Sequence, residues 1–156
     1  MNYVTIIYLF NLLVYVIYFF AKSGNEVAIT NTDYIISTIT SLLLILAGYL
    51  NARQKNTYRS VLWMFFVNIL FLVMSGLFDE FGNNFNLFSR GNDHFIFTLS
   101  LIVFNGYLFP LIVELDKSGL ALVVPVLLSF ILPSLGYWME KIIPSKKSDS
   151  PEINSK

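Results

Sequence analysis

The sequence predicts an all-α integral membrane protein, a bundle of five transmembrane helices. Apolar residues make up 56% of the 156 residues, and charged residues make up only 13%, about half the share of a typical soluble domain. Five stretches contain no Lys, Arg, Asp or Glu, so every charged residue falls between or after them. Each stretch comes close to the roughly 20 residues that a helix needs to cross a bilayer.

The five expected spans follow one another with short connections. They cover residues 3–21, 34–50, 61–78, 95–113 and 120–139. Their Leu- and Ile-rich runs do not alternate with polar residues, as the strands of a membrane barrel would. Aromatic residues near several span ends suit the headgroup level. We expect residues 1–143 to form one transmembrane domain and the polar residues 144–156 to form a disordered tail.

The first stretch is expected to be a true span. No basic residue precedes it, and its apolar run is longer than that of a usual secretory signal peptide.

The Lys and Arg residues of the loops and the tail set the expected orientation, and Lys22 directly follows the first span. With five crossings, the loop of residues 51–60 and the tail lie on opposite sides, and the Lys and Arg residues divide as six against four. The excess of basic residues on the cytoplasmic side then favours a cytoplasmic tail and an outside N-terminus, in the cell membrane. An alternative has four crossings and a re-entrant last stretch, broken at Pro125 and Pro133. It divides the basic residues as eight against two.

Three Asn residues lie inside the expected spans: Asn11, Asn68 and Asn105. A side-chain amide in hydrocarbon needs a hydrogen-bond partner, so the first interpretation is that these residues join helices. The second is that they line a polar path for a solute. No charged residue lies within the spans, and ion-coupled transporters usually place one there. This favours the first interpretation.

The fourth span carries Gly106, Pro110 and Glu114 at intervals of four. On a continuous helix these residues share one face. Pro110 frees a backbone carbonyl near Gly106, so a kink is expected there. The kink beside the Glu114 carboxylate could act as a gate, but a simple bend with a surface acid is the favoured interpretation.

The loop of residues 79–94 has the most varied polar side chains. Asp79 and Glu80 close one expected helix, and Asp93 and His94 open the next. Carboxylates and a histidine could bind a divalent metal or relay protons. The simpler interpretation is a helix end, a turn and a helix cap, and we expect no metal or cofactor.

The last span carries small residues on one face. Ala121, Pro125, Ser129 and Pro133 recur at intervals of four. Small residues let helix backbones approach closely in a membrane. We therefore expect this face to pack against another helix, the fourth span being the nearest along the chain.

These features restrict the function. One His and no Cys leave no basis for a thiolate metal site or a Cys–His dyad, and the balanced charge does not suit nucleic-acid binding. We expect a non-enzymatic protein that contacts the lipid bilayer and binds another membrane protein or itself, in an accessory, regulatory or immunity-type role. The alternative is an oligomeric pore or a component for transport of a small solute.

Overall fold

The computed structural model describes residues 2–22, 29–55, 58–75, 92–116 and 120–143. In these ranges the regular structure is helical and contains no strand, which confirms the predicted all-α class. The elements are α1 (Tyr3–Lys22), α2 (Asn31–Arg53), α3 (Arg59–Met74), α4 (Asn92–Phe104), the short 3₁₀ helix η2 (Gly106–Leu108), α5 (Phe109–Glu114) and α6 (Val123–Ile142).

Two helices, α2 and α6, are long and apolar enough to cross a membrane. The fourth apolar stretch adds a third crossing only if α4 and α5, which are bent by 74° at their junction, count as one span. Helix α3 has 16 residues and is apolar but shorter than a full span. Among the described residues, two or three helices could therefore span a membrane, and the five predicted spans are not confirmed as long straight helices.

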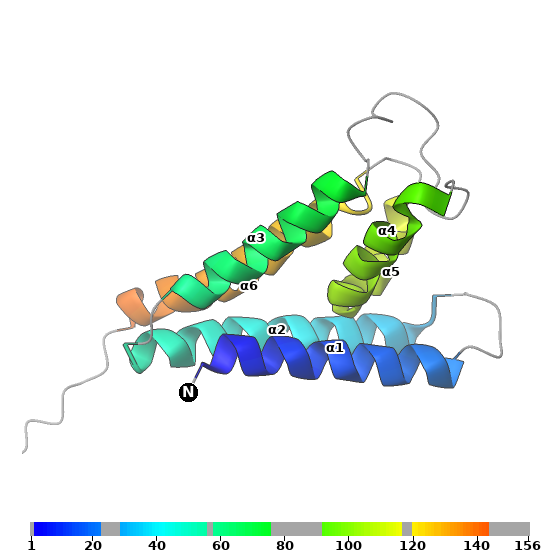
Figure 1. Cartoon of the computed structure of the whole chain (residues 1–156). Coiled ribbons are helices and arrows are strands. Elements are labelled where there is room, and N and C mark those ends of the chain that lie inside the picture. Colours follow the sequence, from blue (N-terminus) through cyan, green and yellow to red (C-terminus); the bar gives the residue numbers. More distant parts are fainter. Residues whose placement is uncertain (1, 23–28, 56–57, 76–91, 117–119, 144–156) are drawn as a thin grey trace, which may run out of the picture.

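The helices form two layers (Figure 1). Helices α1 and α2 lie antiparallel in one layer, α3 and α6 lie antiparallel in the other, and the two layers cross obliquely. The antiparallel pairing of α1 and α2 is fixed where α1 begins. The backbone N–H of Tyr3 donates to Asn51 Oδ1 at 2.8 Å, and Asn51 Nδ2 donates to Asn2 Oδ1 at 2.7 Å.

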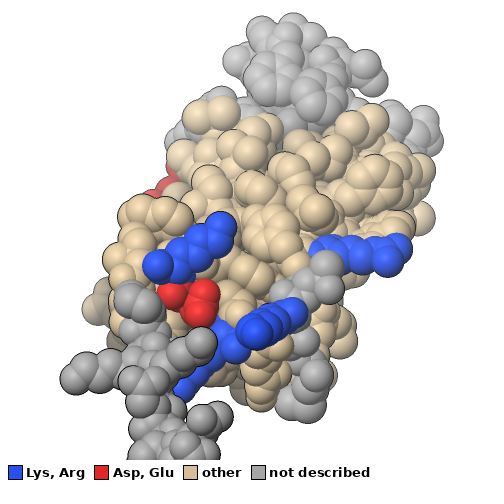
Figure 2. All heavy atoms as spheres, turned by 90° about the vertical axis from the view of Figure 1, so that its left-hand side faces the viewer, with Lys and Arg blue, Asp and Glu red and all other residues tan. Residues whose placement is uncertain are grey.

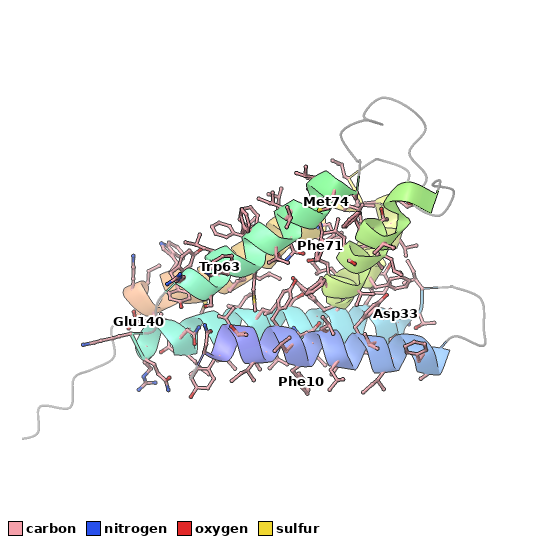
Figure 3. All side chains as sticks on the ribbon, viewed as in Figure 1. Phe10, Asp33, Trp63, Phe71, Met74 and Glu140 are labelled. Carbon is pink, nitrogen blue, oxygen red and sulfur yellow. The ribbon has the colours of Figure 1, made fainter. Side chains whose placement is uncertain are left out.

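Although helix α1 is largely apolar, only one of its faces is buried in the bundle. Val4, Tyr8, Asn11 and Tyr15 are buried and recur at intervals of four and three, the spacing of one helix face. The opposite face, which includes Phe10, is exposed and apolar, as a lipid-facing surface would be (Figure 3).

The contact between α2 and α6 is the most extensive helix pair in the described structure. Two glycines make it possible. A Cβ atom on Gly48 would lie 2.1 Å from the Pro133 carbonyl oxygen, and one on Gly136 would lie 2.0 Å from the Ile45 carbonyl oxygen. Side chains are thus excluded at the crossing point, and the two backbones touch.

The small-residue face of the last span is buried, because Pro125, Ser129 and Pro133 are all buried. The prediction that this face packs mainly against the fourth span was wrong. This helix packs mainly on α2 and next on α3, whereas the sequence favoured the fourth span. The reason is geometric: Gly48 offers a side-chain-free surface on α2, and the fourth stretch is broken into segments too short to present a long face.

The fourth stretch breaks where Pro110 predicts a kink. Pro110 lies in the first turn of α5 and has no N–H to donate to a preceding carbonyl, so the α-helix cannot run through this point. The bend is larger than a simple kink. Gly106 and Glu114 consequently do not share a continuous helix face, which corrects the expectation from their spacing.

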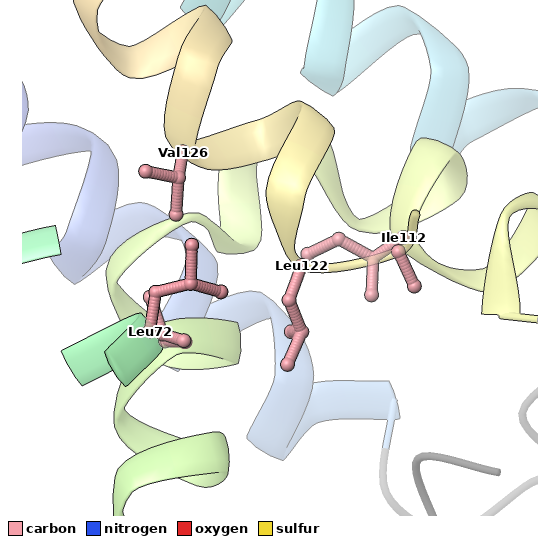
Figure 4. Packing of buried hydrophobic residues seen from close by; sticks show 6 residues of the cluster. Leu72, Ile112, Leu122 and Val126 are labelled. Carbon is pink, nitrogen blue, oxygen red and sulfur yellow. The ribbon is translucent and has the colours of Figure 1, made fainter. Parts of the chain in front are cut away.

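The break lets the stretch begin and end at the same end of the bundle (Figure 1). Leu101 of α4 and Ile112 of α5 belong to one buried cluster together with Leu72 and Leu122, as the close view shows (Figure 4). On a straight helix, 11 residues would separate Leu101 from Ile112 by roughly 16 Å. The cluster therefore joins the end of α3, both halves of the broken stretch and the start of α6.

Helices α2 and α6 consequently run in the same direction. Tyr58, which follows α2, forms a hydrogen bond with Ser134 and stacks edge-on with Tyr137, at 5.0 Å between ring centroids. The ends of α2 and α6 thus lie at the same end of the bundle. Five straight crossings would instead place the loop of residues 51–60 and the tail at opposite ends of the bundle. The last stretch is also not re-entrant, because α6 continues through Pro133.

Some sequence predictions fall outside the described residues. These are the disordered tail of residues 144–156 and the roles of Asp79 and Glu80. Helix α4 begins at Asn92, so Asp93 and His94 lie in its first turn, but their side chains are not among those described.

Candidate functional site: a buried polar cluster and an open groove

Three polar side chains from different helices meet inside the bundle. Asn68 of α3 donates from Nδ2 to the Tyr8 hydroxyl of α1 at 3.0 Å. Asn105, at the helix break, donates from its Nδ2 to Asn68 Oδ1 at 2.7 Å. All three are almost completely buried. The cluster therefore ties α1, α3 and the break of the fourth stretch together.

The two Asn side chains are also held by their own helices. Asn68 Nδ2 lies 2.9 Å from the Met64 carbonyl oxygen, and Asn105 Nδ2 lies 3.0 Å from the Leu101 carbonyl oxygen. In each case the acceptor is one turn earlier. These contacts fix the direction in which each amide points.

The break beside this cluster is tightly packed. A Cβ atom on Gly106 would lie 1.9 Å from Cδ1 of Tyr15, so the ring of Tyr15 occupies the space a side chain would need. The next residue, Tyr107, packs edge-on against Tyr8 with ring centroids 6.2 Å apart. Residues 105–110 are all buried, so the protein itself covers the backbone at the break.

Several polar atoms around the break lack a hydrogen-bond partner among the described residues. They are Asn105 Oδ1 and the Tyr107 hydroxyl. Asn11 Oδ1, on α1, also has no such partner. A buried polar atom without a partner costs about 1–3 kcal/mol. The fold thus tolerates, at the break, buried polar atoms that have no hydrogen-bond partner among the described residues.

Asn11 lies outside the cluster. Its Nδ2 donates to the Thr40 carbonyl oxygen of α2 at 3.2 Å. All three Asn residues therefore donate between elements, but only Asn68 and Asn105 are brought together.

A groove lies between α1 and α3, on the side of the bundle away from the α2–α6 contact. Its volume is about 650 Å³ and it is open rather than enclosed. Asn2, Thr5, Arg59 and Ser60 line the end where α1 and α3 begin. Leu9, Trp63, Met64 and Val67 line the middle, and Tyr8, Asn68 and Phe104 line the inner end. Two members of the polar cluster, Tyr8 and Asn68, therefore belong to the inner wall of what we call the α1–α3 groove.

Charge divides between the two ends of the bundle. Every Lys and Arg side chain that the structure describes lies at the end where α2 and α6 finish: Arg53, Lys55, Arg59 and Lys141. Figure 2 looks at this end and shows the basic groups spread across it beside acidic ones. Asp33 lies at the opposite end, far from Glu140 (Figure 3).

Glu114 and Asp33 both act in holding helix ends. Glu114 accepts a hydrogen bond from the Tyr34 hydroxyl, which joins the end of α5 to the start of α2. Asp33 accepts from the backbone N–H and the hydroxyl of Thr30, each at 2.6 Å. This capping box begins α2, and the pattern Thr-Asn-Thr-Asp is a sequence signal that could have located it.

Ser129 lies on the buried face of α6 and donates to the Val126 carbonyl oxygen within its own helix at 2.7 Å. It does not join the polar cluster in the described contacts. Its small side chain serves the packing of α6.

Sequence reasoning missed Tyr8, Arg59 and the groove. Tyr8 shares the buried α1 face with Asn11, so the helical spacing of polar and apolar residues was an available signal. The groove had no signal in the sequence, because its existence depends on the distance between α1 and α3.

Comparisons with known proteins add no relative. No protein-family model matches the chain, and no curated protein or solved structure matches it. Among the described residues, no group of three or more His, Cys, Asp or Glu is placed to hold a metal ion.

Proposed function

We propose that the chain is a multi-pass membrane protein that works by binding, with another membrane protein or a second copy of itself as partner. The observation that carries the proposal is how the buried polar groups are used. Inside the bundle, the side chains of five polar residues pair with one another or with helix backbones: Tyr8, Asn11, Asn68, Asn105 and Ser129. Such pairing supports a role in assembling helices rather than in transforming a substrate.

The proposed topology has four crossings, by α1, α2, α3 and α6, with α4 and α5 entering and leaving on one side. Support comes from the shared direction of α2 and α6. The basic residues of the sequence then divide as seven, at the end with both termini, against three. For a protein of the cell membrane, the positive-inside rule therefore favours a cytoplasmic C-terminal tail and a cytoplasmic N-terminus. The outside N-terminus expected from five crossings is replaced in this proposal.

Photo-crosslinking in intact membranes tests the binding role. A photoreactive residue replaces Leu13, Phe66 or Ile131, one exposed position on each of three helices. We expect one face alone to form a crosslink to a defined protein or to a second copy. The detergent-corrected mass of the purified protein distinguishes these two partners. A monomer that crosslinks from none of the three faces would contradict the proposal.

A transport role is the second candidate, and the helix break favours it. Broken helices at the membrane midplane form substrate sites in many transporters, and Asn105 Oδ1 and the Tyr107 hydroxyl have no described partner there. If this role is correct, liposomes containing the purified protein will pass a small polar solute faster than empty liposomes. The Asn105→Leu variant will remove that flux. Equal leakage from both liposome preparations would rule out this second candidate.

A further inference from the structure

We propose that the α1–α3 groove binds an anionic phospholipid of the surrounding bilayer, with the phosphate at Arg59 and Ser60 and one acyl chain along the groove. The inference rests on the proposed membrane topology, which puts the start of α3 at the headgroup level of the basic side.

The outer end of the groove has the chemistry of an anion site. Arg59 lines it, and no hydrogen bond or ion pair joins Arg59 to a described residue. Beside it, the Ser60 hydroxyl oxygen is buried and has no hydrogen-bond partner among the described residues. Both residues stand in the first turn of α3, where backbone N–H groups and the helix dipole favour negative charge. A cation, a hydroxyl and a helix start thus converge on one place.

The middle of the groove has the chemistry of an acyl-chain site. Leu9, Trp63, Met64 and Val67 supply apolar walls. Leu9 and Trp63 are 56% and 55% exposed, so the groove opens sideways toward the hydrocarbon. A lipid can therefore enter from the membrane without crossing a polar barrier.

The inner end sets the depth of the site. Asn68 is nine residues beyond Arg59, which corresponds to roughly 13 Å along the helix. Beyond this point the hydrogen-bonded Tyr8 and Asn68 close the groove. The length and the polar-to-apolar order match one end of a phospholipid, whose phosphate lies at the interface and whose chain points inward.

The volume argues against a helix of another protein as occupant. A helix is about 10 Å across, so a 13 Å length of it would take up roughly 1,000 Å³. The groove offers about 650 Å³, which lies within the range of about 300–1,000 Å³ for small-molecule sites.

Trp63 provides a built-in probe. In a Trp138→Phe background it is the only tryptophan, because the chain has two. The protein is reconstituted in phosphatidylcholine vesicles that contain a small fraction of either brominated phosphatidylglycerol or brominated phosphatidylcholine, and quenching of Trp63 fluorescence is measured. We expect the anionic lipid to quench about fivefold more effectively per molecule, the ratio that corresponds to about 1 kcal/mol per basic residue.

Two variants assign the effect to the groove. Arg59→Gln should remove the preference, and Arg59→Lys should retain most of it. Arg53→Gln is the matched control, because Arg53 lies at the same end of the bundle but outside the groove. Arg53→Gln should leave the preference in place.

Equal quenching by both lipids, or an equal loss of preference in Arg59→Gln and Arg53→Gln, would overturn the lipid site. The membrane topology is tested separately by surface labelling. A different labelling pattern would contradict the proposed topology. Failure of the quenching pattern alone would contradict only the proposed lipid site.

Discussion

The two layers of this bundle meet at two helix pairs, α2 with α6 and α1 with α3, and these pairs differ in how closely their helices approach. Along α2 and α6, glycines at positions 48 and 136 let the backbones touch, and no room is left for side chains. Along α1 and α3, Leu9, Trp63 and Met64 line an open groove. Apolar helices of similar composition thus produce a sealed contact on one side and a cavity on the other. Residue size at a few positions, rather than hydrophobicity, decides which contact forms.

The largest effect is expected from Gly48→Leu, which breaks the sealed side. Even the first added carbon would overlap the Pro133 carbonyl, so the layers must separate. We expect a loss of stability near the upper end of the overpacking range, about 3 kcal/mol, seen as a large fall in the thermal unfolding midpoint in detergent. Leu46→Ala on the exposed face of α2 is the control. A similar fall in both variants would show that the crossing point is not special.

The next effect is expected from Ser129→Leu on the buried face of α6. Added bulk at a site that is only 3% exposed should cost about 1–3 kcal/mol. Val123→Leu, at a partly exposed position near the start of α6, should be nearly silent. Equal detergent stability of the two variants would show that the small-residue face is not what packs on α2.

A smaller effect is expected from Asn68→Leu on the open side. This change removes the hydrogen bonds to Tyr8 and Asn105. Hydrogen bonds between membrane helices average about 0.6 kcal/mol each, so the loss should be about 1 kcal/mol. A double-mutant cycle with Asn105→Leu measures the coupling. Strictly additive losses would mean that these two amides do not stabilise the bundle through their contact.

The smallest effect is expected from Val67→Leu, which adds one carbon inside the groove. Because the groove is open there, stability should change by less than about 0.5 kcal/mol. The contrast with Gly48 is the point of the variant. A loss as large as that of a core overpacking variant would show that the groove is closed in the folded protein.

The sequence located the helices better than it located their directions. Charge-free stretches predicted α1, α2 and α6 within a few residues, because a long apolar run without charges favours an apolar helix. The same signal treated residues 95–113 as one straight span, although the structure bends there, since apolarity does not show whether a stretch continues straight. Pro110 indicated a bend but not its size, and the sequence could not show that the ring of Tyr15, from a distant segment, packs against Gly106 at the break.

The candidate site was predictable in part for the same reason. Asn11, Asn68 and Asn105 stood out as polar residues within apolar stretches. Which of them meet depends on the crossing of α1 and α3 and on the break, so the pairing of Asn68 with Asn105 could not be read from spacing. The partnership of α6 with α2 was missed because Gly48 alone does not specify which helix approaches it.

The most direct test of the account asks on which side Gln54 lies. The chain has no cysteine, so single-cysteine variants at Gln54, Asp116 and Ile143 can be labelled in intact cells with a membrane-impermeant maleimide. With four crossings, positions 54 and 143 share the cytoplasmic side, and only Asp116→Cys is labelled before permeabilisation. If Gln54→Cys is labelled together with Asp116→Cys while Ile143→Cys stays protected, the fourth stretch crosses the membrane and the account is wrong.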